Sequence, residues 1–190
     1  MGTHMLVWAL DPVVGFDSAW ATSSAGRLSA EGQQVGLRPR PYSVRYRLET
    51  AERFVTARLT AESRWDGGTA ALDLRRDGER GWTVDGAPRP DLADALDLDL
   101  AACPLTNTMP ILRHALHRGP GDHEFLMAFI ELPSLRVVAS RQRYTHLRSL
   151  PGGAALVQYR SGSFESELTI DAEGFVVDYP RLGRRLEVTG

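Results

Sequence analysis

Alternation of apolar and polar residues recurs along most of the chain and predicts β-strands. In the segment YSVRYRLET, residues 42–50, every second residue is apolar and the residues between are mostly charged. The segment FESELTID, residues 164–171, repeats this arrangement. The apolar positions of the first segment are Tyr42, Val44, Tyr46 and Leu48. A period of two with one apolar face is typical of a half-buried strand in an antiparallel sheet.

Turn sequences that contain glycine separate these segments. Each combines Gly with Asp, Pro or Ser, residues that favour the backbone conformations of tight turns. Several of the turns are roughly eight to twelve residues apart, as in consecutive hairpins. They are Asp66-Gly67-Gly68, Asp77-Gly78, Asp85-Gly86, Pro151-Gly152-Gly153 and Ser161-Gly162-Ser163. The chain is therefore expected to be mainly β and antiparallel.

One segment, residues 108–118, predicts a helix instead. Thr108 can cap its start, Pro110 fits the first turn, where no N–H is needed, and Gly119 can end it. Apolar residues at helical spacing give the segment a stripe that can pack on a sheet: Met109, Leu112 and Leu116. We therefore expect a β-rich domain wrapped partly around one short helix.

The composition fits one domain, residues 5–190, preceded by MGTH, residues 1–4, which looks like an expression leader. A chain of 190 residues can bury a core without disulfides, and its single cysteine, Cys103, can form none within the chain. Neither a secretory signal nor a membrane-spanning apolar run is visible. We therefore expect a cytoplasmic protein without a transmembrane segment.

Basic residues are represented by arginine alone, 22 in number, with no lysine. This excludes a P-loop lysine and a lysine Schiff base. The net charge of −2 argues against a nucleic-acid-binding protein. His114 and His117 lie in the last turn of the predicted helix, where cations are favoured, and no metal-binding motif surrounds them. We expect neither a metal nor another cofactor.

The sequence DLDL, residues 97–100, places two carboxylates in alternation with leucines. On a strand, Asp97 and Asp99 share one face, with Cα atoms about 7 Å apart. They could form an acid/base pair, half of a metal site, polar anchors in a ligand cavity, or a wetted surface. Their separation suits an inverting glycosidase as well as simple neighbours on a sheet, so spacing alone leaves these alternatives open.

Aromatic residues with polar tips are core residues by default, but they also line cavities that bind amphipathic ligands. Amide and guanidinium side chains usually accompany them there. The residues of these types are Trp65, Trp82, Tyr144, Tyr159 and Tyr179, together with Asn107, Gln142 and Arg143. They make a ligand cavity a reasonable hypothesis.

Five segments resemble, in chain order, the family described as "Putative glycolipid-binding". They are YSVRYRLET, RDGERGWTVDGAPRPDL, LDLDLAACPLTNTMPI, QRYTHL and GFVVDYPRL, and the resemblance extends from Trp8 to Leu182. It implies a spiral β-roll, an antiparallel sheet that curves around itself, with a shape similar to periplasmic lipoprotein carriers. The chain departs from the family pattern at Asp94-Ala95, in place of Gly-Cys, and at Leu105, in place of phenylalanine.

Since both aspartates lie in the densest motif of this family, we predict that they face inward and pair with arginine. The candidate partners are Arg58, Arg113 and Arg143. We predict a non-enzymatic binder of a lipid or glycolipid. The alternatives are a hydrolase that uses Asp97 or Asp99, and a structural or interaction protein without ligand. The predicted ligand-binding residues are Arg58, Trp82, Asp97, Asp99, Asn107, Thr108, Arg113, Gln142, Arg143, Tyr144 and Tyr179. The oligomeric state stays open.

Overall fold

The computed structural model describes residues 2–78 and 81–187 and contains one fifteen-stranded sheet. The strands are β1 (Gly2–Leu10), β2 (Gly15–Ser24), β3 (Arg27–Gly36), β4 (Tyr42–Thr50), β5 (Thr56–Trp65), β6 (Gly68–Asp77), β7 (Gly81–Val84), β8 (Ala87–Pro88), β9 (Asp97–Leu100), β10 (Asp122–Ile130), β11 (Val137–Ser149), β12 (Ala155–Ser161), β13 (Phe164–Ile170), β14 (Val176–Tyr179) and β15 (Gly183–Arg185). One α-helix, α1 (Thr108–Arg113), and four 3₁₀ turns complete the fold: η1 (Glu52–Phe54), η2 (Pro90–Leu92), η3 (Pro104–Asn107) and η4 (Pro151–Gly153).

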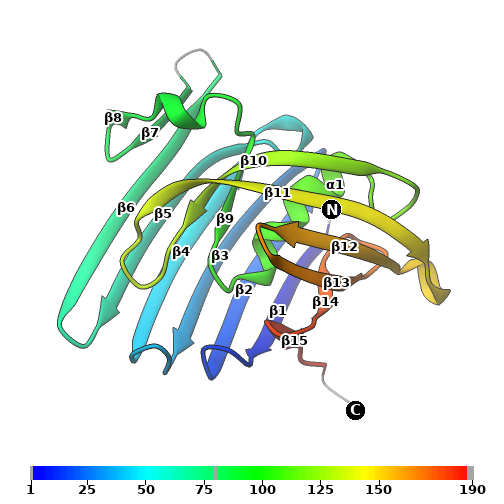
Figure 1. Ribbon diagram of the computed structural model, residues 1–190, viewed down its shortest axis with the longest axis horizontal. Helices are drawn as coiled ribbons and strands as arrows, with labels where there is room; N and C mark the ends of the chain where they lie inside the picture. The colour runs from blue at the N-terminus through cyan, green and yellow to red at the C-terminus, as the bar shows by residue number, and fades with distance from the viewer. Residues whose placement is uncertain (1, 79–80, 188–190) are drawn as a thin grey trace.

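The sheet is a strongly curved roll that does not close. Its order runs from β8 through β1 to β15 and on to β9, so that β8 and β9 remain at the two ends. Strands β1 to β6 form one broad wall, and β10 to β13 run back across it (Figure 1). Neighbouring strands in this order pair antiparallel, except β9 and β10, which pair parallel. This confirms the predicted mainly β roll.

Residues 2–4 of the predicted leader form the start of the first strand, and residue 1 lies outside the described residues. Gly2, Thr3 and His4 belong to β1 and pair with β2, with His4 opposite Ala21. Among the described residues, no helix is long and apolar enough to cross a membrane.

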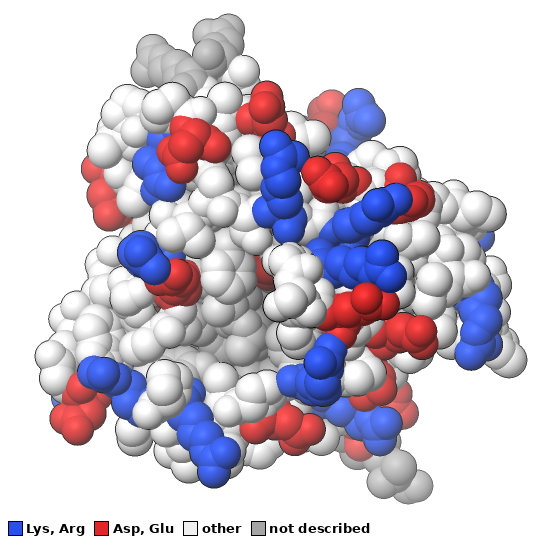
Figure 2. All heavy atoms as spheres, in the orientation of Figure 1, with Lys and Arg blue, Asp and Glu red and all other residues white. Residues whose placement is uncertain are grey.

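The core fills the space between the two parts of the roll. The alternate residues of β4 that were predicted to share an apolar face are all buried, which confirms the period-two pattern. Trp8, Trp82 and Tyr144 are at most 1% exposed and are among the largest fully buried side chains. Figure 2 shows a hollow near the middle of the visible face, bordered mainly by uncharged residues.

The segment from η3 to α1 packs inside the roll, with Leu105, Met109 and Ile111 fully buried. The helix is shorter than predicted, because it ends at Arg113, not near residue 118. Thr108 is its first residue and makes no capping hydrogen bond. Ala115 has a positive φ of 52°, which turns the chain so that Leu116 enters the core. The chain therefore leaves the helix before Leu116, and the turn at Ala115 buries this side chain.

Candidate functional site

Asp97 is an internal anchor between β9 and α1. Its two carboxylate oxygens accept hydrogen bonds from the two terminal nitrogens of Arg113, one of them at 2.7 Å. The side chains of Asp97 and Arg113 are 1% and 2% exposed. Burial raises the pKa of Asp97 while the guanidinium opposes this rise. The pair therefore joins β9 to α1, and the charge of Asp97 is already compensated by Arg113.

Asp99 lies two residues further along β9 in a different environment. Thr106 Oγ1 donates to one carboxylate oxygen at 2.9 Å, and Gln142 Nε2 donates to the other at 2.6 Å. Burial raises the pKa of Asp99 to about 6, since no charged side chain of the described residues pairs with it. A carboxylate can accept about four hydrogen bonds, and these two leave capacity for a ligand.

A second group of hydrogen bonds holds the donors of Asp99 in place. Tyr144 Oη donates to Asn107 Oδ1 at 2.8 Å and lies 3.2 Å from Gln142 Oε1. Asn107 Nδ2 donates to the Pro104 carbonyl at 3.3 Å. These bonds join η3 to β11, so the orientation of Gln142 toward Asp99 is set by two elements distant in sequence.

Asp99 and Asn107 open onto a pocket of about 250 Å³ on the inner side of the roll. Its remaining wall includes four aromatic side chains: Phe129, Tyr159, Phe164 and Tyr179. The ring centroids of Tyr159 and Tyr179 are 5.7 Å apart, and those of Tyr159 and Phe164 are 6.0 Å apart. We call this the Asp99 pocket. It combines stacking surfaces with a carboxylate and an amide, as ligand sites commonly do.

The other predicted site residues lie away from this pocket. Trp82 is buried and its indole donates to the Ala95 carbonyl at 2.8 Å. Arg58 and Arg143 face outward and pair with Asp73 and Asp122, so Arg113 is the candidate arginine that pairs with a predicted aspartate. Thr108 is buried, and its hydroxyl has no hydrogen-bond partner among the described residues. The structure brings together Asp99, Asn107, Gln142, Tyr144 and Tyr179.

A further buried carboxylate, Asp17 of β2, was missed by the sequence analysis. Tyr46 Oη donates to it at 3.2 Å and Cys103 Sγ at 3.3 Å. Burial raises the pKa of Asp17 to about 7. The signal was present in the sequence, because the period of two puts Asp17 on the same face as Ala19 and Ala21. Asp17 therefore interrupts an otherwise apolar stripe.

Unpaired polar atoms lie on the same inner face as Asp17. Gln34 Oε1, Tyr42 Oη and Ser63 Oγ are buried without a hydrogen-bond partner among the described residues. Gln34 is the cross-strand neighbour of Asp17, and its amide nitrogen donates to the Ala102 carbonyl at 2.5 Å. Polar atoms in such a position are often paired by internal water.

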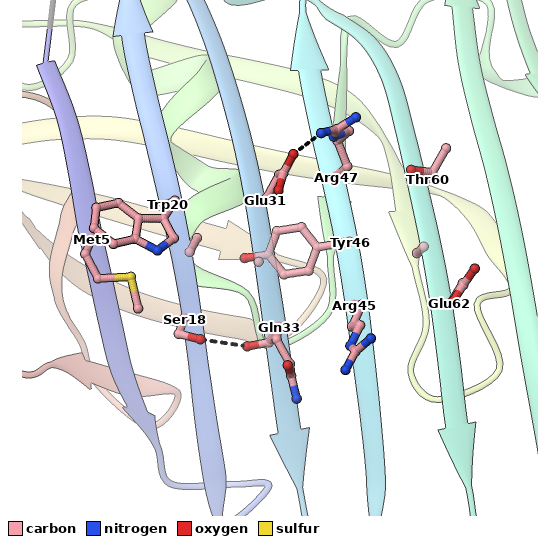
Figure 3. A pocket seen from close by; sticks show the side chains of 13 residues that line it. Met5, Ser18, Trp20, Glu31, Gln33, Arg45, Tyr46, Arg47, Thr60 and Glu62 are labelled. Atoms are coloured by element: carbon pink, nitrogen blue, oxygen red, sulfur yellow. Dashed lines mark hydrogen bonds and ion pairs between the residues drawn. The ribbon is translucent and has the colours of Figure 1, made fainter.

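The outer face of β1 to β5 carries a shallow groove of about 540 Å³ (Figure 3). Trp20 is 59% exposed and lies opposite Met5 of the neighbouring strand. Glu31 and Arg47 form an ion pair across the next two strands. Sequence analysis did not single out Trp20, although its place between polar neighbours on the outward face of β2 was a readable signal.

In the described residues, no three His, Cys, Asp or Glu side chains are grouped as metal ligands. Together these observations define an open β-roll with an aromatic pocket that contains a carboxylate. The profile of the family described as "Putative glycolipid-binding" matches residues 5–185, and the chain belongs to this family. The resemblance seen in the sequence is thereby confirmed.

Two solved structures show a similar fold. A DUF1089 family protein from Pseudomonas aeruginosa is 29% identical, with a TM-score of 0.72 over 90% of this chain and 92% of that chain. A beta-barrel-like protein of domain of unknown function DUF1849 from Brucella abortus is 9% identical, with a TM-score of 0.55 over 97% and 96% of the two chains. The second shows the fold alone. No curated protein matches the chain.

Proposed function

We propose that this protein binds a glycolipid and that the Asp99 pocket receives its sugar. The convergence of Asp99 and Asn107 with four aromatic rings carries this proposal. Sugar hydroxyls donate to carboxylate and amide oxygens, and the apolar faces of sugar rings pack against aromatic rings. Membership of the family supports the same class of ligand.

The size of the pocket restricts which part of the ligand it receives. Its volume of about 250 Å³ is below the roughly 300–1,000 Å³ of pockets that enclose drug-sized molecules. Side chains of the core fill much of the remaining interior. The pocket therefore suits a sugar headgroup, with the hydrocarbon chains lying outside, next to Phe164 and Leu182 at its border.

Asp99 gives this binding a pH dependence. With a pKa of about 6, the carboxylate is mostly ionised at neutral pH and accepts hydrogen bonds from ligand hydroxyls. Protonation removes part of this capacity and turns one oxygen into a donor. The affinity is therefore expected to fall as the pH falls through about 6, and to depend less on pH in Asp99→Asn.

Titration calorimetry with octyl glucoside below its micellar concentration tests the proposal, with methyl glucoside and octanoate as partial ligands. Octyl glucoside should bind more tightly than either. Asp99→Asn and Tyr179→Ala should each weaken binding about tenfold or more, since each removes a contact inside the pocket. Arg143→Gln is the matched control, because Arg143 pairs with Asp122 on the outer side. Equal affinity in all variants would contradict the proposal.

Gentle-ionisation mass spectrometry of the purified protein tests for a natural ligand. A bound mass that disappears on denaturation and is extracted into organic solvent would identify its chemical class. The Asp99→Asn protein should carry less of it. A co-purifying molecule that contains no sugar would contradict the glycolipid proposal.

The hydrolase alternative receives no support from the geometry. Both oxygens of Asp97 accept hydrogen bonds from Arg113, and its side chain is 1% exposed. Asp97 is therefore poorly placed to act as an acid or base beside Asp99.

A further inference from the structure

Exposed apolar side chains are concentrated on one face of the roll. Nine large apolar residues in the described chain are exposed, and six of them lie on the outer side of β1 to β3 or in the turn and loop at the end of these strands. The six are Met5, Val14, Phe16, Trp20, Val35 and Leu37. We call this surface the outer apolar face. Such a concentration is unusual for a surface that contacts water alone.

The six residues form two adjoining groups. Trp20 and Met5 are cross-strand neighbours in the middle of the wall (Figure 3). Phe16 and Val35 are cross-strand neighbours nearer the strand ends and border a second groove of about 740 Å³. Leu37, which is 60% exposed, also borders this second groove. Phe16 and Trp20 both point outward from β2, which makes the two groups continuous.

The backbone holds the second group in place. The N–H groups of Leu37 and Arg38 both donate to the Val13 carbonyl, at 2.7 and 3.0 Å. These bonds join the β1–β2 turn to the β3–β4 loop. Val14 and Leu37 therefore project from a connected edge, seen at the bottom of Figure 1.

Arginines surround this projecting edge. The β3–β4 loop reads Leu37-Arg38-Pro39-Arg40-Pro41, exposed throughout, and Arg64 of β5 borders the same groove. Asp11 and Asp66 lie at the same end of the strands, so the three arginines are in slight excess there. In Figure 2 several blue side chains lie along the lower left edge. An anionic surface is the complementary partner.

We infer that the outer apolar face docks on a bilayer surface that contains anionic phospholipid. Tryptophan, phenylalanine and leucine insert at the boundary between headgroups and acyl chains, and neighbouring arginines bind lipid phosphates. The wall formed by β1 to β4 is broad, and no helix formed by the described residues covers its outer side (Figure 1). This inference does not rest on the proposed ligand, because docking uses a different face from the Asp99 pocket.

Vesicle flotation tests the docking surface. The protein should float with vesicles of phosphatidylcholine and phosphatidylglycerol in a 7:3 ratio, and much less with phosphatidylcholine alone. Phe16→Ser combined with Leu37→Ser should reduce the floated fraction at least tenfold. Leu147→Ser, which changes an exposed leucine of β11, is the matched control and should float like the unmodified protein.

Tryptophan fluorescence provides a second readout. Of the four tryptophans, Trp20 is the most exposed, whereas Trp8 and Trp82 are buried and Trp65 is partly buried. Brominated lipids in the same vesicles should quench Trp20 on docking. Trp20→Phe should remove most of that quenching, which assigns the contact to the outer apolar face.

Absence of flotation with anionic vesicles would overturn the inference, as would flotation unaffected by the Phe16 and Leu37 substitutions. If that double variant does not fold, Arg38→Gln with Arg40→Gln replaces it and should lose the preference for phosphatidylglycerol. If light scattering showed a dimer that the apolar substitutions dissociate, and the protein did not bind vesicles, the face would be assigned to self-association instead.

The Asp99→Asn variant should still float, because these vesicles contain no glycolipid. Failure of the docking inference can therefore be distinguished from failure of the proposed glycolipid binding.

Discussion

The three buried carboxylates of the described residues are stabilised in three different ways. Asp97 is paired with a guanidinium, Asp99 accepts hydrogen bonds from an amide and a hydroxyl, and Asp17 accepts them from a phenol and a thiol. A neutral donor compensates an ionised carboxylate less fully than a charged partner does, because it supplies no opposite charge. Burial therefore raises the pKa of Asp17 to about 7 and that of Asp99 to about 6, and the hydrogen bonds from neutral donors oppose this rise only in part.

Asp17→Asn should change how stability depends on pH. The pKa of Asp17 is raised from 3.8 to about 7, so the folded protein retains a proton that the unfolded chain releases between these values. The contribution of the carboxyl to stability is thus lost as the pH rises from about 4 to about 7. Asparagine has no proton to release. The free energy of unfolding of the variant should therefore rise relative to that of the unmodified protein over this pH range, by at most about 4 kcal/mol.

Urea unfolding of both proteins at pH 4.5, 6 and 8 measures this difference. Asp122→Asn is a control, because an exposed ion pair holds the pKa of Asp122 well below its usual value. The difference in free energy of unfolding between Asp122→Asn and the unmodified protein should change little between pH 6 and 8. A difference for Asp17→Asn that is constant with pH would contradict the assigned titration.

At the residue scale, sequence reasoning predicted the inward position of both motif aspartates and included Arg113 among three candidate arginine partners. The predicted arginine partner of Asp99 was wrong, because Arg58 and Arg143 pair with Asp73 and Asp122, and Asp99 accepts from Thr106 and Gln142. Arg113 follows Asp97 at a distance that a turn and a helix can bridge, whereas Gln142 reaches Asp99 through the pairing of β9 with β10 and of β10 with β11. The second contact depends on sheet order and could not be read from local pattern. The ligand-binding role of these residues stays a prediction.

Glycine and tyrosine are paired across strands inside the wall. Gly32 of β3 lies opposite Tyr46 of β4, and Gly36 lies opposite Tyr42. A Cβ atom at Gly32 would overlap the ring of Tyr46. The missing side chain therefore provides the space in which Tyr46 reaches Asp17, and the aromatic ring covers the glycine backbone in return.

Gly32→Ala should destabilise the protein by about 1–3 kcal/mol, the usual cost of overpacking a core. Tyr46 cannot swing away freely, since it is 4% exposed and hydrogen-bonded to Asp17. Gly78→Ala is the matched control: among the described residues no atom lies within 4 Å of its added Cβ, and its φ is outside the left-handed region. It should change the free energy of unfolding by less than about 0.5 kcal/mol. If urea unfolding showed an equal decrease in the free energy of unfolding for Gly32→Ala and Gly78→Ala, this steric explanation would be contradicted.

At the element scale, alternation and turn composition were sufficient to predict strands and hairpins, because both signals are local. The helix was predicted too long because its apolar spacing continues to Leu116. In the structure Leu116 still enters the core, but through a left-handed turn at Ala115. A helical pattern and a tight turn can bury the same residue, and sequence spacing does not distinguish them.

The two ends of the described chain meet in the middle of the sheet. Strand β1 pairs with β15, and the indole nitrogen of Trp8 donates to the Val176 carbonyl at 2.9 Å. No local signal predicts this contact, because it joins residues 168 positions apart. The family resemblance implied the roll, whereas hairpin spacing alone would equally have fitted a flat sheet or a sandwich.

We call the junction formed by the β1–β15 pairing and the Trp8–Val176 hydrogen bond the seam. The Trp8→Phe variant tests how much this seam contributes to stability. The substitution removes the donor to the Val176 carbonyl, at a cost of about 1 kcal/mol beyond the change in packing. Trp82→Phe is the control, because the Ala95 carbonyl keeps its hydrogen bond from Arg76 Nε at 3.0 Å. Both tryptophans are buried, so the packing losses are comparable. Urea denaturation should show the larger loss for Trp8→Phe, and the reverse order would contradict the proposed importance of the seam.

The connection between β9 and β10 fills the interior that the sheet encloses. The turn η3 and helix α1 place Leu105, Met109 and Ile111 where a hollow roll would have free volume. The capacity of the interior is thus set by one connection and not by the register of the strands. Shorter or longer connections at this position can enlarge or reduce the pocket while every strand pair is kept, so that one scaffold can evolve to receive ligands of different size.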